Sequence, residues 1–189
     1  MFSKNIKLEN FKNTKIQKNL KFYFKSLIKK KDDQKNLINS FTKSYSYSFN
    51  KNQIKFFKKF NIYEIYGMGG SSLGAHAIYD FIKSNIKKKF YFYDNLDAKN
   101  KLIKNKKKSL SIIISKSGNT LETIVNENIF SSKTKLFITE NKSNYLRNLA
   151  SKLRAEIIEH KNFIGGRYSV LSEVGMLPAE LMGLNINKF

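Results

Sequence analysis

The spacing of apolar residues changes near residue 60 and divides the sequence into two parts. In the first part, apolar side chains recur every three or four residues, at Ile16, Leu20, Tyr23, Phe24, Leu27 and Ile28. This spacing predicts an amphipathic helix, and a second helix is expected over residues 52–60. We therefore expect residues 1–60 to form a helical N-terminal segment whose apolar faces pack against residues 61–189, which we expect to form one domain.

From residue 61 onward, short apolar runs alternate with longer amphipathic stretches. Strands are expected at residues 62–66, 90–93, 110–114, 136–139 and 156–158. Helices are expected at about residues 73–84, 97–106, 119–130 and 143–154, with a last short helix bracketed by Pro178 and Gly183. The inner face of the helix at 73–84 is predicted to carry Leu73, Ala77, Ile78, Phe81 and Ile82. This alternation predicts an α/β fold, a doubly wound parallel sheet of about five strands with helices on both faces.

The segment from Ser115 to Thr123 joins the buried strand at 110–114 to the following helix. Asn119, followed three residues later by Glu122, is typical of a capping box. A strand-to-helix turn directs free backbone N–H groups and the positive end of the helix dipole outward. This stretch also supplies three hydroxyls, an ammonium group and a glycine, namely Ser115, Ser117, Thr120, Lys116 and Gly118. The segment therefore predicts a phosphate site, although capped polar turns with a glycine are common in α/β proteins of every kind.

A glycine-rich turn, Gly67 to Gly74, follows the first strand and could indicate a dinucleotide site. The dinucleotide fingerprint requires a third glycine where this chain has Ser72, whereas Asp94, near the end of the second strand, keeps the interpretation open. Gly70 removes a side chain and Ser71 offers a donor, so the turn fits a hydroxylated ligand equally well. Both turns lie at the carboxyl ends of strands, where parallel sheets bind ligands.

A third glycine-containing segment, Gly165 to Ser172, follows the last expected strand. Gly166 lets the backbone approach a ligand, and Arg167 offers a planar, permanently charged group suited to an oxyanion or enolate-like charge. The alternative is a surface arginine after a glycine turn.

The composition narrows the classes of function. The net charge is +22, which could indicate a nucleic-acid or membrane surface, but only three of the 36 basic residues are arginine, the residue that base recognition favours. We interpret most lysines as solvated surface charge and expect neither nucleic acid nor membrane as a partner. The absence of cysteine excludes disulfides and thiolate metal sites, and the two histidines argue against a metal centre. No apolar run approaches a membrane span or a signal peptide, so a cytoplasmic protein is expected.

Taken together, the turns at 67–74, 115–123 and 165–172 resemble the first half of the glucose-6-phosphate isomerase family, with its first sugar isomerase (SIS) domain. The Gly-Gly-Arg-Tyr-Ser sequence is the most specific part of this resemblance. It implies that Ser115, Lys116, Ser117 and Thr120 hold the substrate phosphate, with Gly70, Ser71 and Gly166 near the sugar. Arg167 resembles the arginine that stabilises the cis-enediolate formed when a proton moves between C2 and C1. Glu173 departs from the small residue usual at its position.

The resemblance further implies aldose–ketose isomerisation of glucose 6-phosphate and fructose 6-phosphate, without a cofactor or metal, in a homodimer. The family's general-base glutamate, ring-opening histidine and catalytic lysine belong to a second half that this chain does not contain. Glu122 is the only acid beside the expected phosphate site, and we assign it to helix capping. We therefore expect the 189-residue chain to lack activity by itself. The alternative is a stand-alone regulatory SIS domain that binds a sugar phosphate without catalysis.

Overall fold

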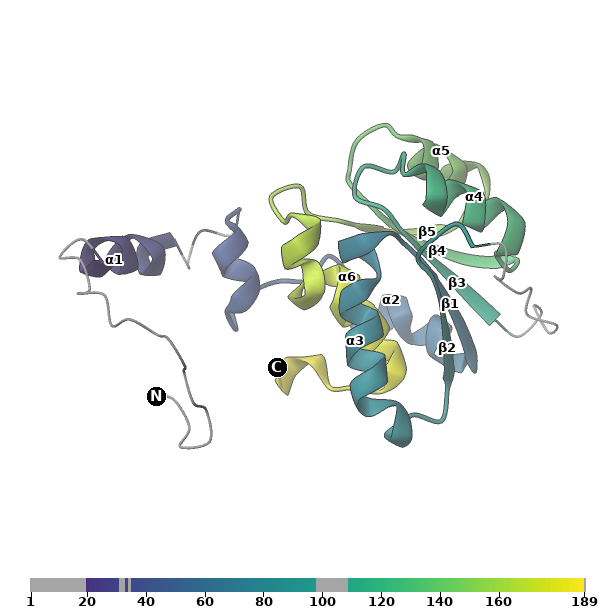
Figure 1. Ribbon diagram of the computed structural model, residues 1–189, viewed down its shortest axis with the longest axis horizontal. Coiled ribbons are helices and arrows are strands. Elements are labelled where there is room, and N and C mark those ends of the chain that lie inside the picture. The colour runs from purple at the N-terminus through teal and green to yellow at the C-terminus, as the bar shows by residue number, and fades with distance from the viewer. Residues whose placement is uncertain (1–19, 31–32, 34, 98–108, 189) are drawn as a thin grey trace.

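The computed structural model describes residues 20–30, 33, 35–97 and 109–188, and these follow the predicted alternation of strands and helices (Figure 1). The strands are β1 (Ile62–Tyr66), β2 (Lys89–Tyr93), β3 (Ser109–Ile114), β4 (Thr134–Thr139) and β5 (Glu156–Glu159). The α-helices are α1 (Leu20–Lys30), α2 (Lys51–Lys55), α3 (Leu73–Ile82), α4 (Leu121–Phe130), α5 (Tyr145–Lys152) and α6 (Glu173–Met182). Short 3₁₀ helices include η1 (Leu37–Phe41), η2 (Phe56–Lys59), η3 (Gly69–Ser71), η4 (Lys83–Asn85), η6 (Gly166–Leu171) and η7 (Ile186–Lys188). The helix expected at 97–106 lies outside the described residues, except for Asp97.

The five strands form one parallel sheet in the order β2-β1-β3-β4-β5. Helices α4 and α5 cover one face, and α2, α3 and α6 lie on the other (Figure 1). Every residue of β3 is buried, because this central strand has a neighbour on each side and helices above and below. The predicted doubly wound α/β fold is confirmed.

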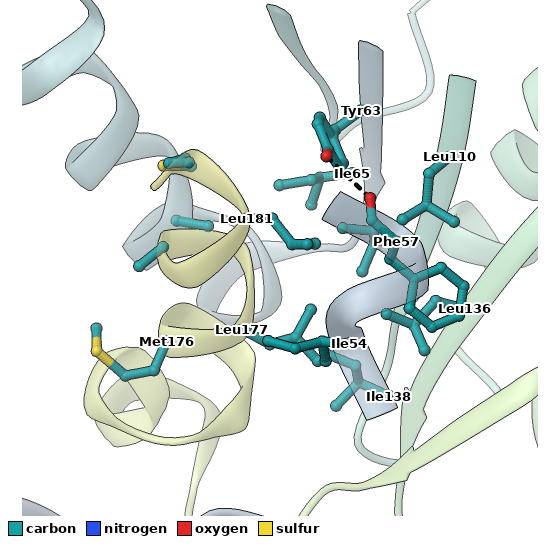
Figure 2. Packing of buried hydrophobic residues seen from close by; sticks show 14 of the residues in the cluster. Ile54, Phe57, Tyr63, Ile65, Leu110, Leu136, Ile138, Met176, Leu177 and Leu181 are labelled. Atoms are coloured by element: carbon teal, nitrogen blue, oxygen red, sulfur yellow. Dashed lines mark hydrogen bonds between the residues drawn. The ribbon is translucent and has the colours of Figure 1, made fainter. Parts of the chain in front are cut away.

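The larger part of the core lies between the sheet and α6. Leu177 and Leu181 of α6 face Ile54 and Phe57, which belong to α2 and η2, and the strand residues behind them (Figure 2). The buried Tyr63 hydroxyl donates a hydrogen bond of 3.0 Å to the carbonyl oxygen of Phe57. The predicted helix at 52–60 thus exists as α2 followed by η2, and it packs on the domain as expected.

Helix α1 was predicted correctly as a helix, but the predicted packing of its apolar face is wrong. None of its residues is buried, and Leu20, Tyr23 and Phe24 are all exposed. In Figure 1 this helix lies well away from the sheet. The physical reason is that the segment closer to the first strand, with Phe49 among its core residues, already covers this part of the domain.

The predicted inner face of α3 is also partly wrong. Ala75, Ile78, Tyr79 and Ile82 face the core, whereas Leu73 and Phe81 are 58% and 89% exposed and Ala77 is exposed. A close backbone contact sets this rotation, because a Cβ atom at Gly74 would lie only 2.9 Å from the Cβ of Val170 in η6. Gly74 thus turns toward η6, and Leu73, Ala77 and Phe81 turn outward.

Pro178 does not mark the boundary of the last helix but lies inside α6. A proline inside a helix removes one backbone hydrogen bond and costs about 3 kcal/mol. All ten residues of α6 are buried, so tertiary packing offsets this cost. The helix ends at Gly183, which has a φ of 102°.

Candidate functional site

Two of the predicted site segments meet where the chain leaves the sheet in opposite directions. From β1 the chain proceeds to the edge strand β2, whereas from β3 it proceeds to β4 and β5 on the other side. The loops after β1 and β3 therefore diverge and leave a crevice, the usual ligand position in such sheets. These loops approach closely, since a Cβ atom at Gly67 would lie 3.2 Å from the carbonyl oxygen of Ile114.

The three hydroxyls of the loop after β3 form one cluster. The Ser115 Oγ lies 2.8 Å from the Thr120 Oγ1 and 3.4 Å from the Ser117 Oγ. The Ser115 hydroxyl also accepts a hydrogen bond of 3.1 Å from the backbone N–H of Gly118. Ser115 is buried and Ser117 is exposed. Ser115 thus anchors the cluster in the interior, and the exposed Ser117 hydroxyl is a hydrogen-bond donor that an anion could approach.

Gly118 gives this loop its shape. Its φ is 67°, in the left-handed region that favours glycine, and any Cβ atom there would overlap the side chain of Asn144. Asn144 is the N-cap of α5, and its Oδ1 accepts a hydrogen bond of 2.8 Å from the N–H of Arg147. The loop after β3 is therefore positioned by the start of α5.

The predicted capping box at the start of α4 does not form. The N-cap is Thr120, without a side-chain capping bond, and α4 begins at Leu121. The Asn119 Oδ1 instead accepts a hydrogen bond of 3.0 Å from the N–H of Tyr145, at the first position of α5. The capping role assigned to Glu122 is therefore wrong, because Asn119, its expected partner in the capping box, binds the start of α5 instead of α4.

The Lys116 side chain belongs to a polar network with Asn162 and Glu140. Its Nζ donates a hydrogen bond of 2.6 Å to the carbonyl oxygen of Asn162 and lies 3.5 Å from the Glu140 Oε1. Burial favours a higher pKa for Glu140, but hydrogen bonds and charges from Lys142 and Lys116 outweigh it and hold the pKa below 4.5. Lys116 thus links the loop after β3 to the end of β4 and to the segment that leads to Arg167.

Arg167 lies in a separate small pocket beside the glycine-rich turn. A cavity of about 420 Å³ is lined by Gly70, Leu73, Gly74, Gly166, Arg167 and Val170. The backbones of Gly70 and Gly166 touch, since a Cβ atom at Gly70 would overlap the Gly166 carbonyl. The Ser169 hydroxyl lies within hydrogen-bond distance of both glycine carbonyl oxygens, 3.0 Å from that of Gly70 and 2.7 Å from that of Gly166.

The Arg167 side chain is exposed, and among the described residues no carboxylate pairs with it. A guanidinium group without an internal partner can bind an anion or stabilise developing negative charge in a ligand. The three residues Gly70, Gly166 and Arg167, predicted from separate segments, are therefore brought together. Ser71 lies at the end of η3 in the same turn.

Three supporting residues were missed by the sequence reasoning. They are Ser169, Asn144 and Glu140, which contact the glycine pair, Gly118 and Lys116 respectively. Ser169 belongs to the Gly-Gly-Arg-Tyr-Ser sequence and could have been found from it. The other two act across the sheet edge, and no local pattern identifies them.

The described residues form neither a metal-binding cluster nor a membrane-spanning helix. His160 is buried, and burial lowers its pKa below 6.5 while its Nδ1 lies 3.1 Å from the Lys161 carbonyl oxygen. Within residues 20–30, 33, 35–97 and 109–188, no group of three histidine or acidic residues could hold a metal ion. No helix in that same part of the chain is long and apolar enough to cross a membrane.

The sequence of this chain is similar to those of known proteins. Residues 12–188 match the family model described as phosphoglucose isomerase. The glucose-6-phosphate isomerase of Methanocaldococcus jannaschii is 40% identical over 147 residues, which cover 70% of this chain and 36% of that protein. The enzyme of the same name from Mesomycoplasma hyopneumoniae is 34% identical over 149 residues, 68% of this chain and 35% of that protein. The chain thus spans about a third of the length of these relatives.

Solved structures show the same fold at low sequence identity. A hypothetical protein from Thermus thermophilus superposes with a TM-score of 0.67 at 19% identity, covering 88% of this chain and 44% of that one. Tagatose-6-phosphate ketose/aldose isomerase from Escherichia coli gives a TM-score of 0.51 at 17% identity, with coverages of 89% and 47%. The expected SIS-type fold is therefore confirmed.

Proposed function

Because the chain belongs to the phosphoglucose isomerase family, we propose that it supplies the phosphate-binding part of a glucose-6-phosphate isomerase. The reaction interconverts glucose 6-phosphate and fructose 6-phosphate, in glycolysis and gluconeogenesis. The single observation that carries this proposal is the hydroxyl cluster of Ser115, Ser117 and Thr120 in the loop after β3.

The hydroxyl cluster suits a phosphate because each hydroxyl can rotate its proton toward an anion. In the described structure these groups bond to one another, and a phosphate oxygen would replace those bonds with charge-assisted ones. The N-terminus of α4 adds the positive end of its dipole and free N–H groups. Lys116 adds positive charge from within the loop, and its link to Asn162 holds the loop in place.

Arg167 would act on the sugar rather than on the phosphate. As a proton moves between C2 and C1, negative charge develops on the O1 and O2 atoms of the cis-enediolate. A preorganised guanidinium stabilises that charge more than it stabilises the neutral substrate, and therefore lowers the barrier. Gly70, Ser71 and Gly166 would contact the sugar, because the paired glycine backbones leave no side chain in the way.

Proton transfer also requires a carboxylate near C1 and C2. None of the residues that line the Arg167 pocket is acidic, so we propose that the general base belongs to polypeptide outside this chain. We expect a homodimer in the intact protein, with residues 61–189 as its sugar-phosphate domain. The 189-residue chain alone is expected to bind sugar phosphate without turning it over.

The first test is calorimetric titration of the chain with glucose 6-phosphate and, separately, glucose. We expect binding of the phosphate ester only, weakened about tenfold to hundredfold by Ser117→Ala, which removes one hydrogen bond to an anion. Ser84→Ala, an exposed serine in η4, is the matched control and should bind as the unchanged chain does. Equal affinity for glucose, or equal loss in both variants, would show that the loop is not a phosphate site.

A stand-alone sugar-phosphate sensor is the second candidate, and the pocket without an acid favours it. Replacement of Arg167 by alanine separates the two functions. A sensor should keep its affinity, whereas an isomerase assembled with the remaining polypeptide should lose turnover. Substantial turnover by the purified chain would contradict both candidates, because each assumes that the general base is absent from it.

A further inference from the structure

A second cavity of the molecule lies at the edge of the sheet opposite the candidate phosphate site. It has a volume of about 700 Å³, within the usual range for small-molecule sites, and it is formed where β4 and β5 begin. The six residues of β4 separate this edge from the carboxyl edge by roughly 16 Å, at about 3.3 Å per residue. The cavity is therefore distinct from the hydroxyl cluster and from Arg167.

Phe56 forms an apolar wall of this cavity and is both exposed and held in place. Its ring is in edge-to-face contact with Phe57 and Phe60, with centroids 5.4 and 6.1 Å away, and the Lys59 Nζ lies 3.5 Å from its centroid. Even so, the side chain is 54% exposed and lines the cavity. An exposed aromatic ring with fixed neighbours is a suitable surface for a planar ligand to stack on. Leu153 adds a second exposed apolar wall.

Two of the cationic residues at the cavity form no ion pair with the described part of the chain. Lys135 pairs with the buried Glu127, and Glu156 accepts a hydrogen bond from Gln53. By contrast, Lys133 and Arg154 are exposed, and no described carboxylate lies within ion-pair distance of either. These two side chains remain available to an anion.

The backbone of Arg154 supports a role for its side chain. It has a φ of 52°, and no other non-glycine residue among the described ones has a positive φ. Arg154 occupies the position after the α5 C-cap, where the hydrogen bonds Arg154 N–H to Ser151 O and Ala155 N–H to Ala150 O form a Schellman motif. Glycine is the favoured residue there, because it adopts this conformation without strain. One of only three arginines in the chain thus occupies a strained position at the rim of this cavity.

We propose that this cavity binds a nucleoside phosphate. The base stacks against Phe56 and Leu153, and the phosphate lies between Arg154 and Lys133. Guanidinium groups bind phosphate through two parallel hydrogen bonds, which explains an arginine rather than a lysine or glycine at position 154. This binding is independent of the sugar-phosphate function proposed above.

The test is titration of the full 189-residue chain with AMP at physiological ionic strength, with adenosine and ribose 5-phosphate as partial ligands. We expect AMP to bind at one site and each partial ligand to bind at least tenfold more weakly. Arg154→Gly should weaken AMP binding at least tenfold without lowering the melting temperature, because glycine relieves the backbone strain. Phe56→Leu should also weaken AMP binding while leaving the net charge unchanged.

Two controls exclude the general attraction of a chain with net charge +22. Lys152→Ala removes one positive charge from the same end of α5, from a residue that does not line the cavity, and should leave AMP binding unchanged. Ser117→Ala at the hydroxyl cluster should also leave it unchanged. No AMP binding, binding of ribose 5-phosphate equal to that of AMP in the Ser117→Ala chain, or an equal loss of AMP binding in Lys152→Ala or Ser117→Ala would overturn the proposal.

Discussion

Gly118 and Gly69 both have a left-handed backbone, but their surroundings differ. Gly118 has a φ of 67°, and the Asn144 side chain occupies the space where a Cβ atom would lie. Gly69 has a φ of 56°, and nothing lies within 4 Å of its Cβ position. We expect Gly118→Ala to lower the free energy of unfolding by about 2 to 4 kcal/mol, through backbone strain and overlap with Asn144.

Gly69→Ala is the matched control, since it introduces only the strain of about 1 to 2 kcal/mol. Urea denaturation of both variants gives the comparison. If Gly118→Ala were no more destabilising than Gly69→Ala, the contact with Asn144 would not shape the loop.

The buried His160 predicts a pH dependence at the residue scale. Its folded pKa is below 6.5, so the unfolded chain binds more protons below that pH, and the free energy of unfolding falls as pH decreases. The slope contributed by one group is at most about 1.4 kcal/mol per pH unit. Urea denaturation between pH 7.5 and 5.5 should show this fall, above the range where Glu140 titrates.

His160→Gln should flatten this dependence, while His76→Gln, at the partly exposed position on α3, should preserve it. An unchanged slope in the His160 variant would assign the dependence to other groups.

At the scale of elements, the orientation of α3 can be tested from both of its faces. Ala75 is buried and Phe81 is 89% exposed. We expect Ala75→Leu to lower the free energy of unfolding by about 1 to 3 kcal/mol, because the closely packed core has no room for three more carbons. Phe81→Ser should change it by less than about 0.5 kcal/mol. Thermal or urea denaturation that ranked the two variants in reverse would contradict the described rotation of α3.

At the scale of the whole molecule, the N-terminal segment divides into a part that packs and a part that does not. Phe49, Ile54 and Phe57 belong to the core, whereas α1 is exposed. The Tyr45 hydroxyl donates to both oxygens of the buried Glu173, at 2.9 and 3.0 Å, and so connects this segment to α6. The charged residue that departs from the family pattern thus has a structural role.

We expect a chain without residues 1–30 to melt at about the temperature of the full chain, and a chain without residues 1–60 to be unfolded. The longer deletion removes core residues and the hydrogen bonds that Tyr45 and Ser48 donate to the buried Glu173, which costs several kcal/mol out of a total stability of about 5 to 15. Circular dichroism melts of both chains provide the measurement. A folded domain formed by residues 61–189 alone would show that the packing of residues 45–60 is dispensable.

The sequence by itself determined the strands, their parallel class and the positions of the turns at 67–74, 115–123 and 165–172, for which ligand binding remains a proposal. Runs such as Ile112 to Ile114 are β-branched and apolar, and glycine and hydroxyl residues follow directly after them. The positions of strands and turns depend mainly on residues that are close together in the sequence. A local pattern of apolar and polar residues is therefore enough to predict them.

The tertiary structure alone decided which faces pack and which polar groups pair. The rotation of α3 depends on Val170, the capping role of Asn119 on Tyr145, and the direction of Lys116 on Glu140 and Asn162. In each case the partner lies more than 20 residues away in the chain, so no local pattern encodes the contact. Close packing and hydrogen bonding between distant segments therefore override the local preferences that predicted a different face or cap.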